Sequence, residues 1–218
     1  MRTFLELFNL AGGKPLSKEE EGGTRRAQIV VRATLASVVF AAIYGLAAGS
    51  TDMALAVSNV YKLPMVILLS TVCSLPIGLL AWKLLGAPNR ASDLLLGAAA
   101  GNFTASLVLA ALAPIVALYY HTSGHLGGIL AIAAGSIATL LGLWNTFRAV
   151  WTRRPADEPA HGLNGTAMSL LRAPALLAPV GLMIVAQLAS LVQFIHVASP
   201  ILPEITVFDG GADELFGG

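Results

Sequence analysis

The sequence predicts an all-α membrane protein, a polytopic bundle of five transmembrane helices with its N-terminus inside the cell and its C-terminus outside. Composition is the first reason: of 218 residues, 56% are hydrophobic and 11% are charged, whereas soluble domains carry about 25% charged residues. The second reason is that the charges gather in short clusters between long apolar stretches. A water-soluble fold cannot bury so much apolar surface, so the lipid bilayer is the first expected partner.

Five stretches are long enough to cross a bilayer. A transmembrane helix needs about 20 mostly apolar residues, because the hydrocarbon layer is about 30 Å thick. The stretches that qualify are 29–49, 63–85, 94–119, 126–150 and 173–195. Short turn-forming segments separate them, together with one longer polar loop at 152–166. Pro64 would then lie in the first turn of the second helix, where its missing N–H costs nothing.

The distribution of lysine and arginine predicts the orientation. Cytoplasmic loops of membrane proteins are enriched in these residues. With five helices and the N-terminus inside, 12 of the 13 basic residues fall on the cytoplasmic side and only Lys62 falls outside. An even number of helices would place the acidic C-terminal tail inside and break this pattern. The count therefore supports five helices, with the N-terminus in and the C-terminus out.

Three regions follow from this topology. Residues 1–28 form a cytoplasmic N-terminal segment, in which 1–10 could give a short amphipathic helix or a frayed tail. Residues 29–200 form the five-helix transmembrane domain, and 201–218 form an acidic external tail. The single cysteine, Cys73, excludes an intramolecular disulfide and is predicted to be a buried small apolar residue.

Little in the sequence points to catalysis. The middle of every predicted helix lacks Asp, Glu, Lys, Arg and His, although buried ionisable groups usually mark proton paths and active sites in membranes. His121 and His125 lie four residues apart, but a turn is expected between them, and a metal site normally needs three or four ligands. We therefore predict no enzyme activity, no catalytic residues, no metal and no cofactor. No basic surface suited to nucleic acid is present either.

Small and polar residues in the third and fourth helices predict close packing. The third helix contains Gly97, Gly101 and Asn102. The fourth contains Gly135, Thr139, Gly142 and Asn145. Glycines let helix backbones approach, and polar side chains then form hydrogen bonds across the contact, worth about 0.6 to 2 kcal/mol each. The hypothesis is a tight helical hairpin held together at Asn102. The alternative is that these polar groups line a path for a solute.

The fifth helix carries a second polar group of residues. Gln187, Ser190 and Gln193 are spaced three apart, which predicts that they share one face. This face should point into the bundle or toward a partner subunit, either another membrane protein or a second copy of the chain.

The overall pattern resembles the Yip1-domain family of membrane proteins. The second predicted helix resembles the corresponding stretch of bacterial Yip1-like proteins through three groups of residues: Lys62-Leu63-Pro64, Leu68-Leu69-Ser70-Thr71 with Leu75-Pro76, and Leu84-Leu85-Gly86. The Asp-Leu-x-Gly-Pro signature of the eukaryotic members is absent. The resemblance implies a non-enzymatic membrane protein that acts through protein partners. The Ala-, Gly- and Arg-rich composition is compatible with a high-GC bacterium, which makes the inner membrane the expected location.

Three functional hypotheses remain at this point. The preferred one is a membrane scaffold or a subunit of a membrane protein complex. A small-solute transporter or channel would use Asn102, Thr139, Asn145 and Gln187 around a cavity. A lipid-modifying enzyme would need His121 and His125 to meet the acidic tail.

Overall fold

The computed structural model describes residues 8–9, 12, 23–87, 90–152 and 165–203, with side chains from 176 onward in the last of these ranges. It contains five long helices: α2 (Gly23–Ala48), α3 (Met53–Leu84), α4 (Ala91–Thr122), α5 (Gly124–Trp151) and α6 (Gly165–Ala198). Within the described residues, all five are long and apolar enough to cross a membrane. The prediction of an all-helical fold with five such helices is confirmed. The orientation across the membrane stays a prediction.

The second helix is longer than predicted. It begins at Met53 and not at residue 63, because the Asp52 carboxylate caps it by accepting hydrogen bonds from the backbone N–H groups of Ala54 at 2.9 Å and Leu55 at 3.4 Å. The prediction that Pro64 lies in the first turn is therefore wrong. Pro64 lies inside α3, as Pro76 does. Membrane helices tolerate such prolines because neighbouring groups can satisfy the freed carbonyls.

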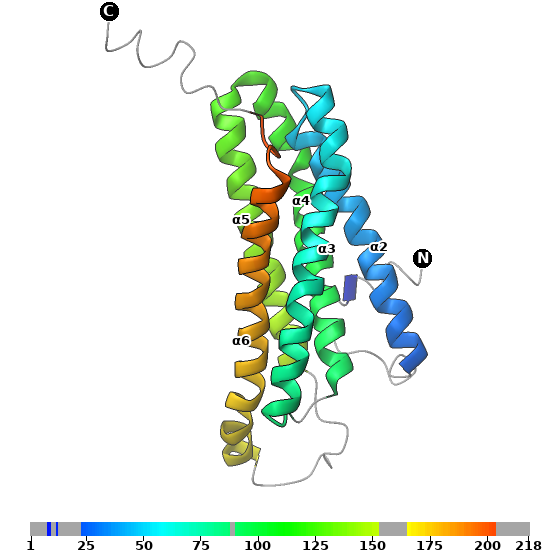
Figure 1. The fold of residues 1–218 in the computed structure, drawn as a ribbon, viewed down its shortest axis with the longest axis vertical. Helices are drawn as coiled ribbons and strands as arrows, with labels where there is room; N and C mark the ends of the chain where they lie inside the picture. Colours follow the sequence, from blue (N-terminus) through cyan, green and yellow to red (C-terminus); the bar gives the residue numbers. More distant parts are fainter. Residues whose placement is uncertain (1–7, 10–11, 13–22, 88–89, 153–164, 204–218) are drawn as a thin grey trace, which may run out of the picture.

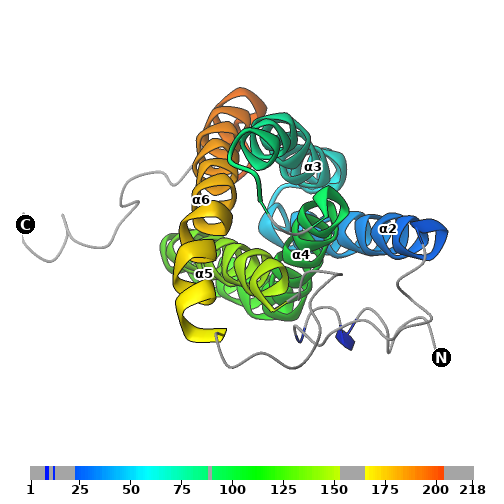
Figure 2. The same cartoon turned by 90° about the horizontal axis from the view of Figure 1, so that it is seen from below.

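The helices run alternately up and down, so that α2 begins at one end of the bundle and α6 finishes at the other (Figure 1). We call these the proximal and the distal end. Seen along the bundle, α2 and α6 lie at opposite edges with α3, α4 and α5 between them (Figure 2). Helix α4 is central: it packs extensively against α5 and α2, whereas α6 packs mainly against α3 and touches α5 at few points.

Three apolar clusters make the core. The distal cluster surrounds Tyr44 and Val116, a second joins α2, α4 and α5 around Phe103, and a third joins α3, α4, α5 and α6 around Trp82 and Met183. Cys73 is exposed on the side of the bundle, so the prediction that it is buried is wrong.

Two predicted regions fall largely outside the described residues. In the N-terminal segment, Phe8 is described, and its ring lies edge-on to Phe103 of α4 with the ring centroids 6.3 Å apart. Of the acidic tail, only 201–203 is described, and Leu202 packs against the distal cluster. The proposed amphipathic helix and the acidic residues of the tail lie outside the described part of the chain.

Candidate functional site

Glycines bring α4 and α5 into backbone contact. A Cβ atom placed on Gly101 would lie 2.6 Å from the carbonyl oxygen of Gly142 and would clash with Thr146 Oγ1. A Cβ atom on Gly142 would lie 2.8 Å from the carbonyl oxygen of Gly101, and one on Gly97 would lie 2.8 Å from Val150 Cγ2. At Gly101 and Gly142, where the close atoms include backbone oxygens, no larger residue fits without moving a helix. The packing resembles that of small-residue contacts between membrane helices in general.

Asn145, and not Asn102, joins the two helices of this hairpin. Its Nδ2 donates to Thr104 Oγ1 at 2.7 Å and to the carbonyl oxygen of Ala100 at 3.3 Å, both on α4. The hypothesis that Asn102 holds the hairpin is wrong. Asn102 is the next residue after Gly101, so the two residues point in different directions. Successive residues are turned by about 100° around a helix, so when Gly101 faces α5, Asn102 faces α3 and α6.

Asn102 instead belongs to a polar cluster that joins three helices. Its Nδ2 donates to Thr71 Oγ1 of α3 at 2.8 Å. Gln187 of α6 completes the cluster: its Nε2 lies 3.2 Å from Thr71 Oγ1 and 3.4 Å from Asn102 Oδ1. The Thr71 hydroxyl donates to the carbonyl oxygen of Ile67 at 2.9 Å. Gln187 Oε1 is buried and has no hydrogen-bond partner among the described residues.

Beside this cluster lies a cavity of about 590 Å³, bounded by α3, α4, α5 and α6 and by Tyr44 of α2. This is within the range of about 300–1,000 Å³ that is usual for small-molecule sites. Apolar side chains make most of its wall, and Asn102, Thr139 and Gln187 are among its polar lining residues. The structure therefore brings three of the predicted residues to one site, while Asn145 is turned toward α4.

Gly135 also lines the cavity but has a different role from the other glycines. A Cβ atom placed on it would meet no atom within 4 Å. Thr139 donates its hydroxyl to the carbonyl oxygen of Gly135, one turn earlier in the same helix.

The chain that follows α6 closes the distal end of the cavity. Asn59 Nδ2 donates to the carbonyl oxygen of Ile201 at 2.6 Å, and Lys62 Nζ donates to that of Pro200 at 3.0 Å. These contacts hold Ile201 and Leu202 as part of the cavity wall. This closure could not be predicted from the sequence, because residues 59 and 201 are far apart along the chain.

Gln187 and Gln193 lie on different sides of α6, and the side that carries Gln193 is called the outer face. Gln187 is partly buried in the polar cluster, whereas Gln193 is exposed on the surface of the helix. Gln193 follows Gln187 by six residues, which places the two side chains about 240° apart around the helix axis. The prediction that both share one face is therefore wrong. Ala186 and Ala189 lie near Gln193 on the same side of α6, at i, i+3 and i+7 spacing.

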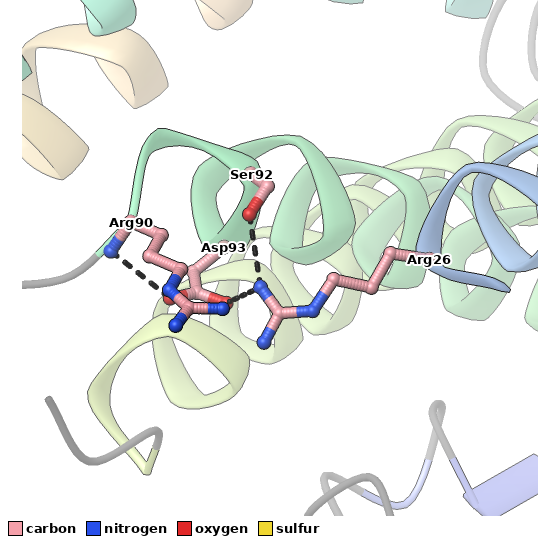
Figure 3. Close-up of polar contacts among 4 residues, drawn as sticks. All are labelled: Arg26, Arg90, Ser92 and Asp93. Atoms are coloured by element: carbon pink, nitrogen blue, oxygen red, sulfur yellow. Dashed lines mark hydrogen bonds and ion pairs between the residues drawn. The ribbon is translucent and has the colours of Figure 1, made fainter. Parts of the chain in front are cut away.

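An ion pair near the proximal end ties α2 to α4. Arg26 Nη1 donates to Asp93 Oδ1 and to Ser92 Oγ, each at 2.9 Å (Figure 3). Asp93 Oδ2 also accepts the backbone N–H of Arg90 at 3.2 Å, which caps α4. The side chains of Arg26 and Asp93 are only 13% and 6% exposed. Sequence reasoning missed this pair, because the two residues lie 67 positions apart along the chain, each just outside an apolar stretch.

The histidines form no site in the described part of the chain. His121 lies in the last turn of α4 and His125 in the first turn of α5, on either side of Ser123, and both are exposed. No group of three or more His, Cys, Asp or Glu residues that could hold a metal ion occurs among the described residues. Comparison with protein-family models, with curated proteins and with solved structures gives no match for this chain.

Proposed function

We propose that this chain is a non-enzymatic membrane protein that serves as a subunit or scaffold of a membrane protein complex. In this proposal, the outer face of α6 binds a transmembrane helix of another membrane protein. The observation that carries it is the exposed amide of Gln193 on that face.

The chemistry of this face favours a helical partner. An amide exposed to hydrocarbon is costly unless it is hydrogen-bonded, by roughly 2–7 kcal/mol for a polar group of this kind. Ala186 and Ala189 beside it are small enough to let a second helix approach. Of the five candidate spans, α6 is also the one least buried within the bundle. A partner helix would cover this surface and satisfy the amide.

The resemblance to Yip1-domain proteins supports the same proposal, since it implies action through protein partners. The proposed location is the inner membrane of a bacterium, with the N-terminus in the cytoplasm and the C-terminus outside. Both follow from composition and from the distribution of basic residues.

A solute transporter is less well supported. Asn102, Thr139 and Gln187 line one cavity, but the wall is mostly apolar and Asn145 is engaged with Thr104. A hydrated path would need more polar groups than this cavity offers.

The test is affinity purification of the full chain from its native membrane in mild detergent, followed by mass spectrometry. We expect another membrane protein to be recovered in stoichiometric amount. The Gln193→Leu variant should lower that recovery at least several-fold, because the amide can no longer pair with the partner.

The Val192→Leu variant is the matched control. Val192 is exposed on the same helix and lies about 100° around it from Gln193, so this variant should keep the partner. A clean monomer, a homo-oligomer or unchanged recovery with Gln193→Leu would overturn the proposal.

A further inference from the structure

The cavity opens sideways, toward the lipid. Leu140 and Ile132 of α5 and Leu188 of α6 line the cavity and are also exposed on the outside of the bundle. These residues flank the line along which α5 and α6 make few contacts. A molecule could therefore enter from the hydrocarbon layer between these two helices, without crossing the aqueous phase.

The hydrogen-bond network fixes which end of the Gln187 amide is available. Asn102 Nδ2 donates to Thr71 Oγ1, so Asn102 Oδ1 is the acceptor that remains, and the Thr71 hydroxyl already donates to Ile67. Both groups facing Gln187 are thus acceptors, and Gln187 must present its Nε2 to them. Its Oε1 is then a buried acceptor, on a residue that lines the cavity.

These features together define the chemistry of a ligand. Among the described residues, no charged side chain lines the cavity, so a charged group brought into it would be strongly disfavoured. The buried Oε1 calls for a single O–H or N–H donor. If each heavy atom takes about the 30 Å³ of a water molecule in the liquid, the cavity of about 590 Å³ holds a ligand of roughly 20 heavy atoms.

We propose that this cavity binds an uncharged, single-chain lipid alcohol. Its hydroxyl donates to Gln187 Oε1, and its hydrocarbon chain lies along the apolar wall formed by α5 and α6. This site is separate from the Gln193 face and does not depend on a partner protein. Purified chain alone is therefore sufficient to test it, and the outcome is independent of the proposed function.

The experiment uses the full chain in detergent micelles with a hexadecanol probe that carries a photoreactive group in its chain. Labelled residues are located by mass spectrometry, and unlabelled hexadecanol competes against hexadecane, which has the same chain but no donor. We expect labels on the cavity wall. Hexadecanol should compete roughly three- to tenfold better than hexadecane, as one buried hydrogen bond implies.

Three variants assign the effect to the cavity. Gln187→Leu should abolish the preference for the alcohol, while Gln193→Leu, the same change on the exposed face, should keep it. Gly135→Leu should reduce labelling of the wall, because its side chain enters the cavity without touching the Gln187 network. If hexadecanol and hexadecane competed equally well in the unchanged chain, the cavity would bind hydrocarbon chains without selecting for a hydroxyl group. That result would overturn the proposal. So would unchanged labelling in Gly135→Leu, or competition by palmitate as strong as by the alcohol.

Discussion

Helix α5 packs very differently at two levels along its length. Toward α4, Gly142 meets Gly101 backbone to backbone, and Asn145 adds a hydrogen bond to Thr104 at 2.7 Å. Nearer the start of the same helix, Gly135 and Thr139 line a cavity of about 590 Å³. Both levels contain glycine and polar residues, so composition alone does not distinguish them.

The difference lies in whether the facing helix offers a matching small residue. Gly101 stands opposite Gly142, and the two backbones meet. A Cβ atom placed on Gly135 would have no atom within 4 Å. Without a hydrophobic driving force between helices in lipid, close packing needs complementary surfaces on both sides. A glycine on one side only leaves space, and in this protein that space is the candidate binding site.

The largest expected effect comes from filling the α4–α5 contact. Gly101→Leu should prevent the native bundle from forming, because its side chain would collide with Thr146 and with the backbone of Gly142. Size-exclusion chromatography of the solubilised protein should show aggregate in place of a single folded species. Gly135→Leu is the control and should remain folded. If both variants behaved alike, the contrast between the two levels of α5 would be wrong.

A smaller loss of stability is expected where α4 contacts α2. Asp93→Ala removes the partner of the mostly buried Arg26 and the cap of α4. It should lower the free energy of unfolding by about 3 kcal/mol, as expected for an unpaired, largely buried charge and a lost cap. Unfolding in mixed micelles with increasing SDS measures this. Ser92→Ala, which removes only the neutral acceptor, should cost about 1 kcal/mol; an equal cost for both would argue against the ion pair.

A double-mutant cycle can separate Asn145 from Asn102. Asn145→Leu combined with Thr104→Val should show a coupling energy of about 0.6 to 1.7 kcal/mol, because these side chains share a hydrogen bond across the α4–α5 contact. Asn102→Leu with Thr104→Val should show a coupling energy near zero, since Asn102 faces Thr71 and Gln187. The reverse result would restore Asn102 as the residue that holds the hairpin.

The last prediction concerns access and involves the smallest change in stability. In a Cys73→Ser background, the thiol of Gly135→Cys should react with a small membrane-permeant maleimide, whereas that of Ala149→Cys should not. Ala149 is 3% exposed and lies in the core between α2, α4 and α5. Intact mass spectrometry gives the labelled fraction, with exposed Cys73 of the unchanged chain as the positive control. Equal labelling at 135 and 149 would show that the cavity is closed or that the core is open.

The sequence by itself determined the number and type of the helices. Apolar stretches of about 20 residues are a direct requirement of the hydrocarbon layer, so they can be read from composition without knowing any neighbour. The same holds for the glycines of α4 and α5 as candidates for close packing. Helix ends were less predictable, as the earlier start of α3 shows, since Asp52 extends that helix through a cap that hydropathy does not register.

Only the tertiary structure decided which polar groups meet. Asn102 and Asn145 look alike in the sequence, yet one joins α3, α4 and α6 and the other joins α4 to α5. Gln187 and Gln193 carry the same side chain on one helix, yet one is in the polar cluster and the other is exposed. A rotation of about 100° per residue makes the partner of each side chain depend on where the neighbouring helices stand. In a membrane, where every face of a helix can be apolar, that placement is set by packing between helices and not by the pattern along one of them.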